Sequence, residues 1–488
     1  MLFDVAIIGY GPSGATLANL LAIYGHSVLI IDREKDLYHL PRAVHFDDEV
    51  MRVFQHIGIA EALSEKIHIN PGMRFIDQQD RLLLDWPRPQ RLTEHGWHAS
   101  YRLHQPDLER LLRDRLAHYP AVSAITNMAV TKIEEAQDHI TLSAESRITG
   151  TIHSFKSKFV VGCDGANSFV RHHMGVGMED LGFAEDWLVI DLHLKQPRPD
   201  LGDHTIQFCY PDRPMTYCRN PGLRRRWEFA LKPDEDAQII SQPEMIWQLL
   251  SKWITPEQAE LERRQVYTFR SQIANSWRQG RFFLAGDAAH LTPPFMGQGM
   301  CMGIRDAANL AWKLNAVLSG MTDDTILHSY EQERSPHSRA FIETAKHLGG
   351  LINSIDTKTA LSMADPRSDG HKQLRLLAPK LGKSALFSAS QHHHIDVIGR
   401  PCPQFKIGQN ATSMDNLIGP NHLIICKDQP DNLAPHTACI TPQDSPKINQ
   451  FLDQQDAFAI WVRPDRYCGA MAPDLQNMQT RFPHWLFR

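Results

Sequence analysis

Residues 3–14, FDVAIIGYGPSG, join an apolar run to glycines spaced as G-x-G-x-x-G. The run predicts a buried strand, and the following residues predict a helix over 15–24 and a second strand over 27–32. Glycines at this spacing allow a tight turn and let a pyrophosphate approach the N-terminus of the helix. The three glycines are Gly9, Gly11 and Gly14. The stretch predicts a Rossmann-like dinucleotide site, and the alternative is a glycine-rich turn in another strand–helix–strand unit.

Asp32 ends the second predicted strand of this unit. A carboxylate at that place can accept hydrogen bonds from the two hydroxyls of a ribose. Arg33 follows it, and we assign both residues to the predicted cofactor site.

A second stretch, residues 281–313, predicts a short buried strand, a turn at 286–287, a loop and a long amphipathic helix. Two prolines stiffen the loop and two glycines leave its backbone bare before the helix. They are Pro293, Pro294, Gly297 and Gly299. Unpaired N–H groups and the positive end of the helix dipole would stabilise an electron-rich, partly anionic ring above this loop. The alternative is an ordinary strand-to-loop turn whose glycines only relieve crowding.

A third stretch, residues 158–171, delivers Asp164 and Gly165 at the end of a buried strand, with Arg171 about two helical turns further on. Strand-end polar residues of this kind are typical of the ligand-binding edge of an open α/β sheet. Three such segments in one chain favour a cofactor site over coincidence.

Between the second and third stretches the pattern changes to strands of alternating polarity, from about residue 187 to 270. This pattern predicts an antiparallel sheet, one face of which would cover the cofactor. We expect Tyr217, Arg219 and Trp227 to line a substrate pocket on that face. The alternative for each of them is packing or surface exposure.

The overall composition excludes several classes of protein. The 488 residues are 42% hydrophobic and 22% charged with a net charge of -5, which is ordinary for a globular enzyme and gives no general attraction to nucleic acid or anionic membranes. No apolar run approaches the ~20 residues needed to cross a bilayer, and no secretion signal is apparent, so we expect a cytoplasmic protein. The eight cysteines form no CxxC pair and no zinc spacing, so no metal site is expected.

Together the three stretches resemble the signatures of the group A aromatic hydroxylases, the flavin monooxygenases related to p-hydroxybenzoate hydroxylase. The resemblance implies that FAD is the cofactor. It implies that Asp287 holds the ribitol and that the helix start faces the flavin pyrimidine. It also places an arginine, a glutamine and an Asp-Gly motif at the FAD. The residues implied in these roles are Arg42, Gln105, Asp164, Gly297, Gly299 and Met300.

The same resemblance implies the reaction. Only one G-x-G-x-x-G is present, so NADH or NADPH would act as a co-substrate without a Rossmann domain of its own. In the family, reduced FAD and O2 give a C4a-hydroperoxide that hydroxylates an activated arene in a pocket closed to water. Pro293, Phe295 and Met296 are expected to form apolar walls of that pocket. The candidates for the base that activates a phenol are His45, Tyr217 and a backbone carbonyl near Pro293.

Within this family the chain is most similar to hydroxylases of 3-(3-hydroxyphenyl)propionate, on segments such as Arg264-Gln-Val-Tyr-Thr and Arg463-Pro-Asp-Arg. It departs from them at Asp32, where glutamate is usual, and at Met300-Cys-Met302. The expected substrate is therefore a small phenolic acid of that type. The alternatives are resorcinol, an indole derivative or a polycyclic phenol, and a non-enzymatic alternative is an FAD-binding redox sensor. The family also suggests a homodimer.

These patterns predict an α/β fold in four parts. Residues 1–180 and 265–355 form a Rossmann-like FAD-binding domain, and 181–264 form an inserted antiparallel substrate-binding sheet. Residues 356–402 read as a linker. Residues 403–488 resemble the C-terminal thioredoxin-like α/β domain of the larger members, here without CxxC.

Overall fold

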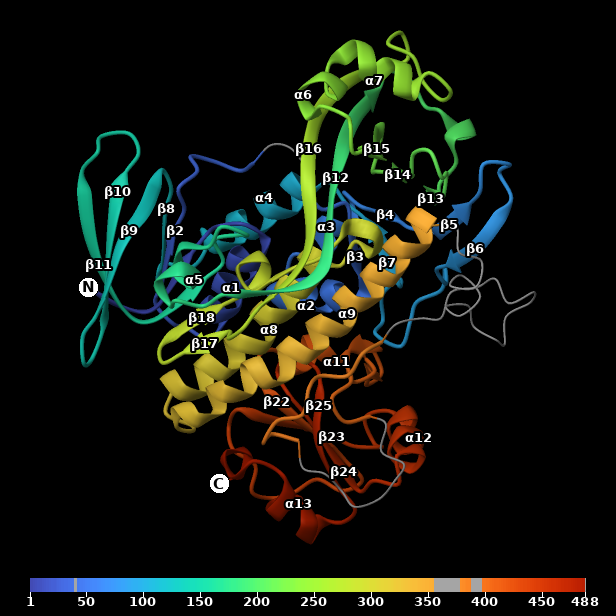
Figure 1. Ribbon diagram of the computed structural model, residues 1–488. Helices are drawn as coiled ribbons and strands as arrows, with labels where there is room; N and C mark the ends of the chain where they lie inside the picture. The colour runs from blue at the N-terminus through green and yellow to red at the C-terminus, as the bar shows by residue number, and fades with distance from the viewer. Residues whose placement is uncertain (39–41, 355–377, 388–396, 488) are drawn as a thin grey trace.

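The computed structural model describes residues 1–38, 42–354, 378–387 and 397–487 (Figure 1). Figure 1 shows a layered α/β body from which two long strands, β12 and β16, rise into a second sheet, while the C-terminal part lies under helices α8 and α9. The mixed α/β class predicted from the sequence is confirmed.

The first sheet has the strand order β17-β18-β11-β1-β2-β8, with β10 and β9 added beside β11. Its central pairs are parallel, as expected for a doubly wound sheet covered by helices. Its strands are β1 Leu2–Ile8, β2 Val28–Ile31, β8 Val122–Ile125, β9 Met128–Glu135, β10 Ile140–Ser146, β11 Ile152–Gly162, β17 Arg278–Gln279 and β18 Phe282–Leu284. The apolar side chains of β1 and β2 are buried almost throughout, which explains their continuous hydrophobic runs.

Helices surround this sheet and a small three-stranded sheet lies beside it. Helix α1 begins at Pro12, where proline costs no helical hydrogen bond, and packs against α4 and α8. Helix α2 is capped by Asp47, whose side chain accepts a hydrogen bond from Val50 N at 3.1 Å. The elements are α1 Pro12–Ile23, α2 Asp48–Ile57, α3 Ala60–Ser64, α4 Gln105–Leu116, α5 Phe169–His173, α8 Gly299–Leu318, α9 His328–Ser354, β3 His45–Asp47, β4 His68–Ile69 and β7 Ser100–Arg102.

The second sheet has the order β19-β16-β12-β15-β14-β13-β5-β6 and is antiparallel except between β13 and β5. Its strands are β5 Gly72–Ile76, β6 Leu82–Pro87, β12 Met178–Leu194, β13 Thr205–Phe208, β14 Met215–Arg219, β15 Arg224–Ala230, β16 Ala259–Ala274 and β19 His290–Leu291. The sheet therefore extends beyond the predicted range 181–264, because β5 and β6 join it from the N-terminal part of the chain. One face packs on α6 Ala237–Ile240 and α7 Pro243–Leu250 through a second apolar cluster.

The C-terminal part contains a four-stranded sheet of order β23-β22-β24-β25. Strand β22 is parallel to β23 and antiparallel to β24. The elements are β20 Lys406–Ile407, β21 Thr412–Ser413, α11 Met414–Ile418, β22 His422–Cys426, β23 Thr437–Ile440, α12 Pro446–Gln454, β24 Ala459–Val462, β25 Cys468–Ala472 and α13 Leu475–Arg481. Most of the predicted linker 356–402 lies outside the described residues.

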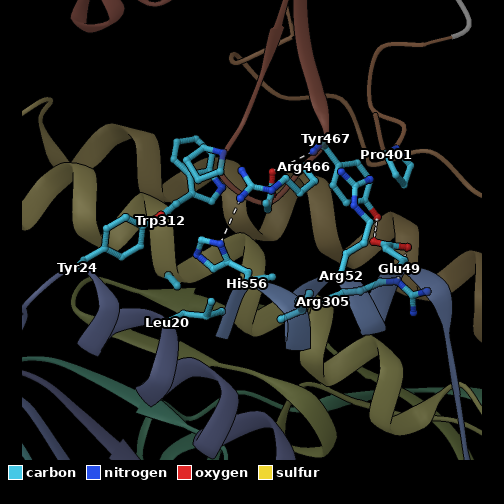
Figure 2. A pocket seen from close by; sticks show the side chains of 15 residues that line it. Leu20, Tyr24, Glu49, Arg52, His56, Arg305, Trp312, Pro401, Arg466 and Tyr467 are labelled. Carbon is cyan, nitrogen blue, oxygen red and sulfur yellow. Dashed lines mark hydrogen bonds and ion pairs between the residues drawn. The ribbon is translucent and has the colours of Figure 1, made fainter. Parts of the chain in front are cut away.

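Buried charges join the C-terminal part to the helices above it. Glu333 of α9 pairs with Lys313 of α8 at 2.8 Å and with Arg463 at 2.9 Å, and all three side chains are fully buried. Nearby, the hydroxyl of Tyr467 donates to Glu49, which in turn pairs with Arg305 at 2.7 Å (Figure 2). The C-terminal part is thus joined to the helices by the fully buried Glu333–Arg463 ion pair and by the hydrogen bond from Tyr467 to Glu49.

None of the helices in the described ranges has the length and apolar character needed to cross a lipid bilayer.

Candidate active site

A cavity of about 480 Å³ runs between the two sheets. One end lies at the loop before α1 and at the turn that contains Asp287. The other end lies under the second sheet, where β13, β14 and β15 contribute side chains. The N-terminus of α8 and residues 293–297 lie between the two ends. The cavity therefore brings together all three sequence stretches and the inserted sheet.

The three glycines of the first loop have different tasks. A Cβ at Gly9, whose φ is +105°, would lie 2.3 Å from the carbonyl oxygen of Cys163, and a Cβ at Gly14 would lie 2.1 Å from that of Gly9. A Cβ at Gly11 would meet no protein atom within 4 Å, and Gly11 lines the cavity. Gly9 and Gly14 thus serve backbone packing, while the bare surface of Gly11 leaves room for a pyrophosphate at the positive end of α1.

Asp32 organises the turn after β2. Its carboxylate accepts hydrogen bonds from Tyr10 N at 2.6 Å and from Glu34 N at 2.7 Å. Asp32 keeps further lone pairs for a ligand, but it does not line the cavity. Arg33 is exposed and lies 3.4 Å from Glu34, so its predicted cofactor contact has no support from its position.

The side chain of Asp287 is exposed to the open cavity and accepts no hydrogen bond from the described part of the chain. The surrounding protein raises the pKa of this carboxyl by desolvation, although His290 and Arg42 act in the opposite direction. A carboxylate that is open to the cavity and has no protein partner can accept hydrogen bonds from the hydroxyls of a ribitol chain.

The turn that carries Asp287 is positioned by Asp306 of α8. The buried Asp306 carboxylate accepts from Gly286 N at 3.0 Å, from His290 Nε2 at 2.7 Å and from Arg334 Nε at 2.9 Å. A Cβ at Gly303 would lie 2.2 Å from Ser13 Oγ, so α1 and α8 approach closely only because this residue is glycine. Sequence analysis did not single out Asp306 or Gly303.

The start of α8 has the expected form. Gly297 adopts a φ of +64°, and a Cβ there would lie 2.8 Å from Cβ of His45. The N-cap Gln298 makes no side-chain cap, so the first N–H groups of α8 remain available at a wall lined by Gly299 and Met300. Pro293, Phe295 and Met296 line the same wall, and their contact with a substrate stays a prediction.

Two of the residues predicted to contact the cofactor also hold the protein backbone, and their contact with FAD stays a prediction, because Gln105 lines the cavity and Asp164 Oδ1 is buried without a partner among the described residues. Gln105 Oε1 accepts from Arg42 N at 3.0 Å and Ala43 N at 2.6 Å, so it fixes the segment at the cavity edge. Asp164 Oδ2 accepts from Val170 N at 3.1 Å, and only the neighbours of Asp164 line the cavity. Arg42 itself lines the cavity.

His45 lines the cavity, but both of its ring nitrogens are engaged. Nδ1 donates to the carbonyl of Gly297 at 3.3 Å, and Nε2 accepts from Ser100 Oγ at 2.8 Å. Burial, followed by the charge of Arg102, lowers the pKa of His45 to about 3. The structure thus makes His45 a neutral support for the Gly297 turn rather than a free base.

The predicted substrate residues of the inserted sheet lie on its other face. Tyr217 and Trp227 are 3% and 0% exposed, and both belong to the apolar cluster under α6 and α7. The Tyr217 hydroxyl donates to Gly202 O at 3.3 Å, and Arg219 pairs with Asp203 at 2.7 Å. None of these three residues lines the cavity. Successive side chains of a strand point to opposite faces, so the prediction chose the wrong alternate residues.

The cavity face of that sheet is polar instead. Strands β13 and β14 present Thr205, Gln207 and Thr216, and their side-chain polar atoms are buried without a hydrogen-bond partner among the described residues. Gln207 is fully buried, and in the same part of the chain neither its amide oxygen nor its amide nitrogen has a partner. Buried polar groups in this state are costly unless a ligand or water satisfies them, so they mark a ligand-binding wall.

A bare glycine loop at α1, a cavity-facing acid after β18 and an open α8 N-terminus are together typical of a Rossmann-type flavoprotein, and the cavity continues under the inserted sheet. The model of the FAD binding domain family matches residues 3–345. The chain therefore belongs to that family, and it is an FAD-dependent aromatic-ring hydroxylase.

Individual relatives agree with this assignment. The chain is 37% identical over 86% of its length to a probable NADH-specific resorcinol 4-hydroxylase of Rhodococcus jostii (strain RHA1), 78% of which is covered. It is 32% identical over 96% of its length to a 3-(3-hydroxy-phenyl)propionate/3-hydroxycinnamic acid hydroxylase of Burkholderia cenocepacia (strain HI2424), 93% of which is covered. A crystal structure of aklavinone-11 hydroxylase with FAD and aklavinone shares the fold, with a TM-score of 0.82 at 19% identity over 99% of both chains.

Replacing Asp306 is expected to loosen the cofactor. Asp306→Asn removes the charge that pairs with Arg334 and weakens the hold on Gly286, and breaking such a buried pair costs about 3–5 kcal/mol. We expect the purified variant to contain less FAD per chain and to unfold at lower temperature, as measured by flavin absorbance and thermal denaturation. Asp324→Asn is the control, because the Arg278–Asp324 pair has an acid that is 66% exposed. Full FAD content and an unchanged unfolding temperature in Asp306→Asn would contradict this role.

Proposed function

We propose that the protein hydroxylates a small single-ring phenol with NADH and O2, and that phenolic acids of the 3-(3-hydroxyphenyl)propionate type are its first candidate substrates. The observation that carries this proposal is the shared cavity, in which the wall of unsatisfied polar groups faces the apolar α8 side. A phenol ring bound there can satisfy Gln207 and Thr216 through its hydroxyl while its apolar edges contact Phe295 and Met296.

When bound, FAD supplies the redox chemistry, which is acceptance of hydride and activation of dioxygen. The residues that would hold it are Gly11, Asp287 and the first turn of α8. The protein's own tasks are to orient the ring and to exclude water. Phe295, which contacts Trp187 and Phe183 edge-on at ring distances of 5.5 and 5.7 Å, closes one side of the cavity with aromatic surface.

Resorcinol is the second candidate substrate. The wall formed by Thr205, Gln207 and Thr216 offers several neutral donors and acceptors, which suits two ring hydroxyls. The Rhodococcus relative is named for that substrate.

The proposal is tested by oxidation of NADH and NADPH by the FAD-loaded protein, with oxygen uptake and product analysis. The panel contains 3-(3-hydroxyphenyl)propionate, 3-hydroxycinnamate, resorcinol, indole and a polycyclic phenol. Oxidation stimulated by a single-ring phenol and coupled to its hydroxylated product is the expected result. The absence of stimulation by every compound would reject the proposal.

The difference between the two faces of the inserted sheet leads to a further prediction. Thr216→Val keeps the side-chain shape but removes a polar group from the cavity wall, so KM for the phenol is expected to change by at least about fivefold, which is roughly 1 kcal/mol. Tyr217→Phe removes a hydroxyl on the apolar face and is expected to leave kcat and KM within about twofold. Steady-state kinetics would contradict this assignment if Tyr217→Phe were the more damaging change.

We also propose the domain division 1–180 with 265–355, 181–264 and 403–488, with β5 and β6 added to the inserted sheet. The C-terminal strand order and its parallel β22–β23 pair support a thioredoxin-like unit. In the described chain, residues 427–436 connect β22 to β23 without a helix, the place where a redox helix would stand. A homodimer and a cytoplasmic location stay predictions, and light scattering of the purified protein would test the first.

A further inference from the structure

The cavity contains more positive charge than the protein itself neutralises. Within the inserted sheet, two acidic side chains lie close to two arginines. Arg226 donates to both oxygens of Asp191 at 2.7 and 3.0 Å and lies 3.7 Å from Glu228, while Arg263 lies 3.7 Å from Asp191. These four charges balance one another.

Arg102 of β7 takes no part in these ion pairs. It is 4% exposed, lines the cavity, and its side chain has no hydrogen bond or ion pair within the described residues. Burial lowers the pKa of Arg102, but an arginine keeps its charge at neutral pH. Glu228 acts on Arg102 from a distance and opposes this shift, but no carboxylate in the described chain forms a direct ion pair with Arg102. A buried guanidinium that lacks a direct ion pair is costly, and a bound anion would offset that cost.

Arg88 lies at the same part of the cavity. Its guanidinium stacks over the ring of Trp86 at 3.9 Å and makes no ion pair within the described ranges. Burial lowers the pKa of Arg88 to about 10, and the charge of Arg102 acts in the same direction. Asp47 and Asp48 act on Arg88 in the opposite direction, but each has a closer partner. Asp47 pairs with Arg305 at 2.6 Å, and Asp48 lies 3.0 Å from His95 Nδ1.

We propose that Arg102 and Arg88 form an anion subsite that binds the carboxylate of the substrate and thereby selects phenolic acids over neutral phenols. This inference rests on the proposed function and narrows it. Two arginines that line the same cavity supply the N–H donors that a carboxylate needs for both of its oxygens. The neutral groups Thr205, Gln207 and Thr216 then remain for the phenol. The pair therefore determines specificity and takes no part in oxygen transfer.

The test compares 3-(3-hydroxyphenyl)propionate with its methyl ester, which keeps the ring and chain but lacks the charge. Wild-type enzyme is expected to favour the acid by about 100-fold in kcat/KM, since a hydrogen-bonded charge pair contributes about 1.5–3 kcal/mol. In Arg102→Gln this preference is expected to fall to within about threefold, with most of the change in KM. Arg102→Lys should recover part of it. Arg88→Gln should give a smaller loss of the same kind.

Two controls keep the inference falsifiable. Arg219→Gln removes an arginine on the other face of the sheet, paired with Asp203, and is expected to keep the full preference. FAD content is measured for each variant, and loss of FAD from Arg102→Gln would overturn the inference by placing Arg102 at the cofactor. Equal loss of activity on the acid and the ester would also overturn it. If Arg102→Gln does not fold, the comparison of acid and ester on wild-type enzyme decides.

The outcome for the wild-type enzyme separates the two proposals. Turnover of resorcinol and of the ester as well as the acid would reject the anion subsite and keep the hydroxylase. No turnover of any phenol would reject the proposed function itself, and binding of 3-phenylpropionate against its amide, followed through the flavin spectrum, would still test the subsite.

Discussion

Gly14→Ala is expected to yield a protein without FAD and with a strongly lowered unfolding temperature. The added Cβ would lie 2.1 Å from the carbonyl oxygen of Gly9. Because this oxygen belongs to the backbone, no side-chain rotation can relieve the clash. We expect a cost at or above the upper end of the roughly 1–3 kcal/mol typical of overpacking. Flavin absorbance of the purified protein and thermal denaturation measure the two effects.

Gly11→Ala is the matched variant, because Gly11 lies in the same loop. Gly11 has φ -77° and ψ -173°, which alanine adopts without strain, and its Cβ would meet no protein atom within 4 Å. The variant should therefore fold as the wild type does, yet bind FAD at least about tenfold more weakly, a loss of about 1.4 kcal/mol. Wild-type affinity in Gly11→Ala would show that no phosphate lies against this residue.

Glu333→Gln is expected to lower stability by about 3–5 kcal/mol, because it leaves Lys313 and Arg463 buried without their shared counter-ion. Chemical denaturation measures the loss. Asp453→Asn is the control, since its 2.7 Å pair with Lys427 is 51% and 41% exposed at the two side chains and should contribute at most about 1 kcal/mol. Similar effects of the two substitutions would contradict a special role for the buried network.

The pH dependence of this stabilisation follows from the pKa of Glu333. Burial acts to raise the pKa of Glu333, but Arg463 and Lys313 more than offset it and hold the pKa at about 2. Because the folded pKa lies below the unfolded value of about 4.3, the stabilisation is present above that value and is lost as the pH falls toward 2. The wild type should lose this contribution in acid, whereas Glu333→Gln has none to lose.

Local patterns were sufficient to predict the first sheet and the FAD-binding family. The strand and glycine loop at residues 3–14, the turn at Asp287 and the start of α8 all depend on neighbours within a few residues, so their chemistry is visible in the sequence. The confirmed FAD family rests on these same segments.

The substrate end could not be predicted in this way. Which alternate residues of β14 and β15 face the cavity is decided by α6 and α7, which cover the face that carries Tyr217 and Trp227. Arg102 lies at a strand end that leads into a helix, and nothing in that pattern indicates a ligand; only the absence of a side-chain partner among the described residues marks it. The buried pair of Glu333 and Arg463 joins residues far apart in sequence.

The division of labour between the two faces of the inserted sheet has a consequence for engineering. The apolar side chains under α6 and α7 form the core of this sheet, whereas the side chains of Thr205, Gln207 and Thr216 make no hydrogen bonds within the described residues. A library confined to these three positions can therefore be screened for new phenols with little loss of soluble protein, while the neighbouring residues in the same strands are kept constant. Substrate range and foldability can be varied independently within one sheet.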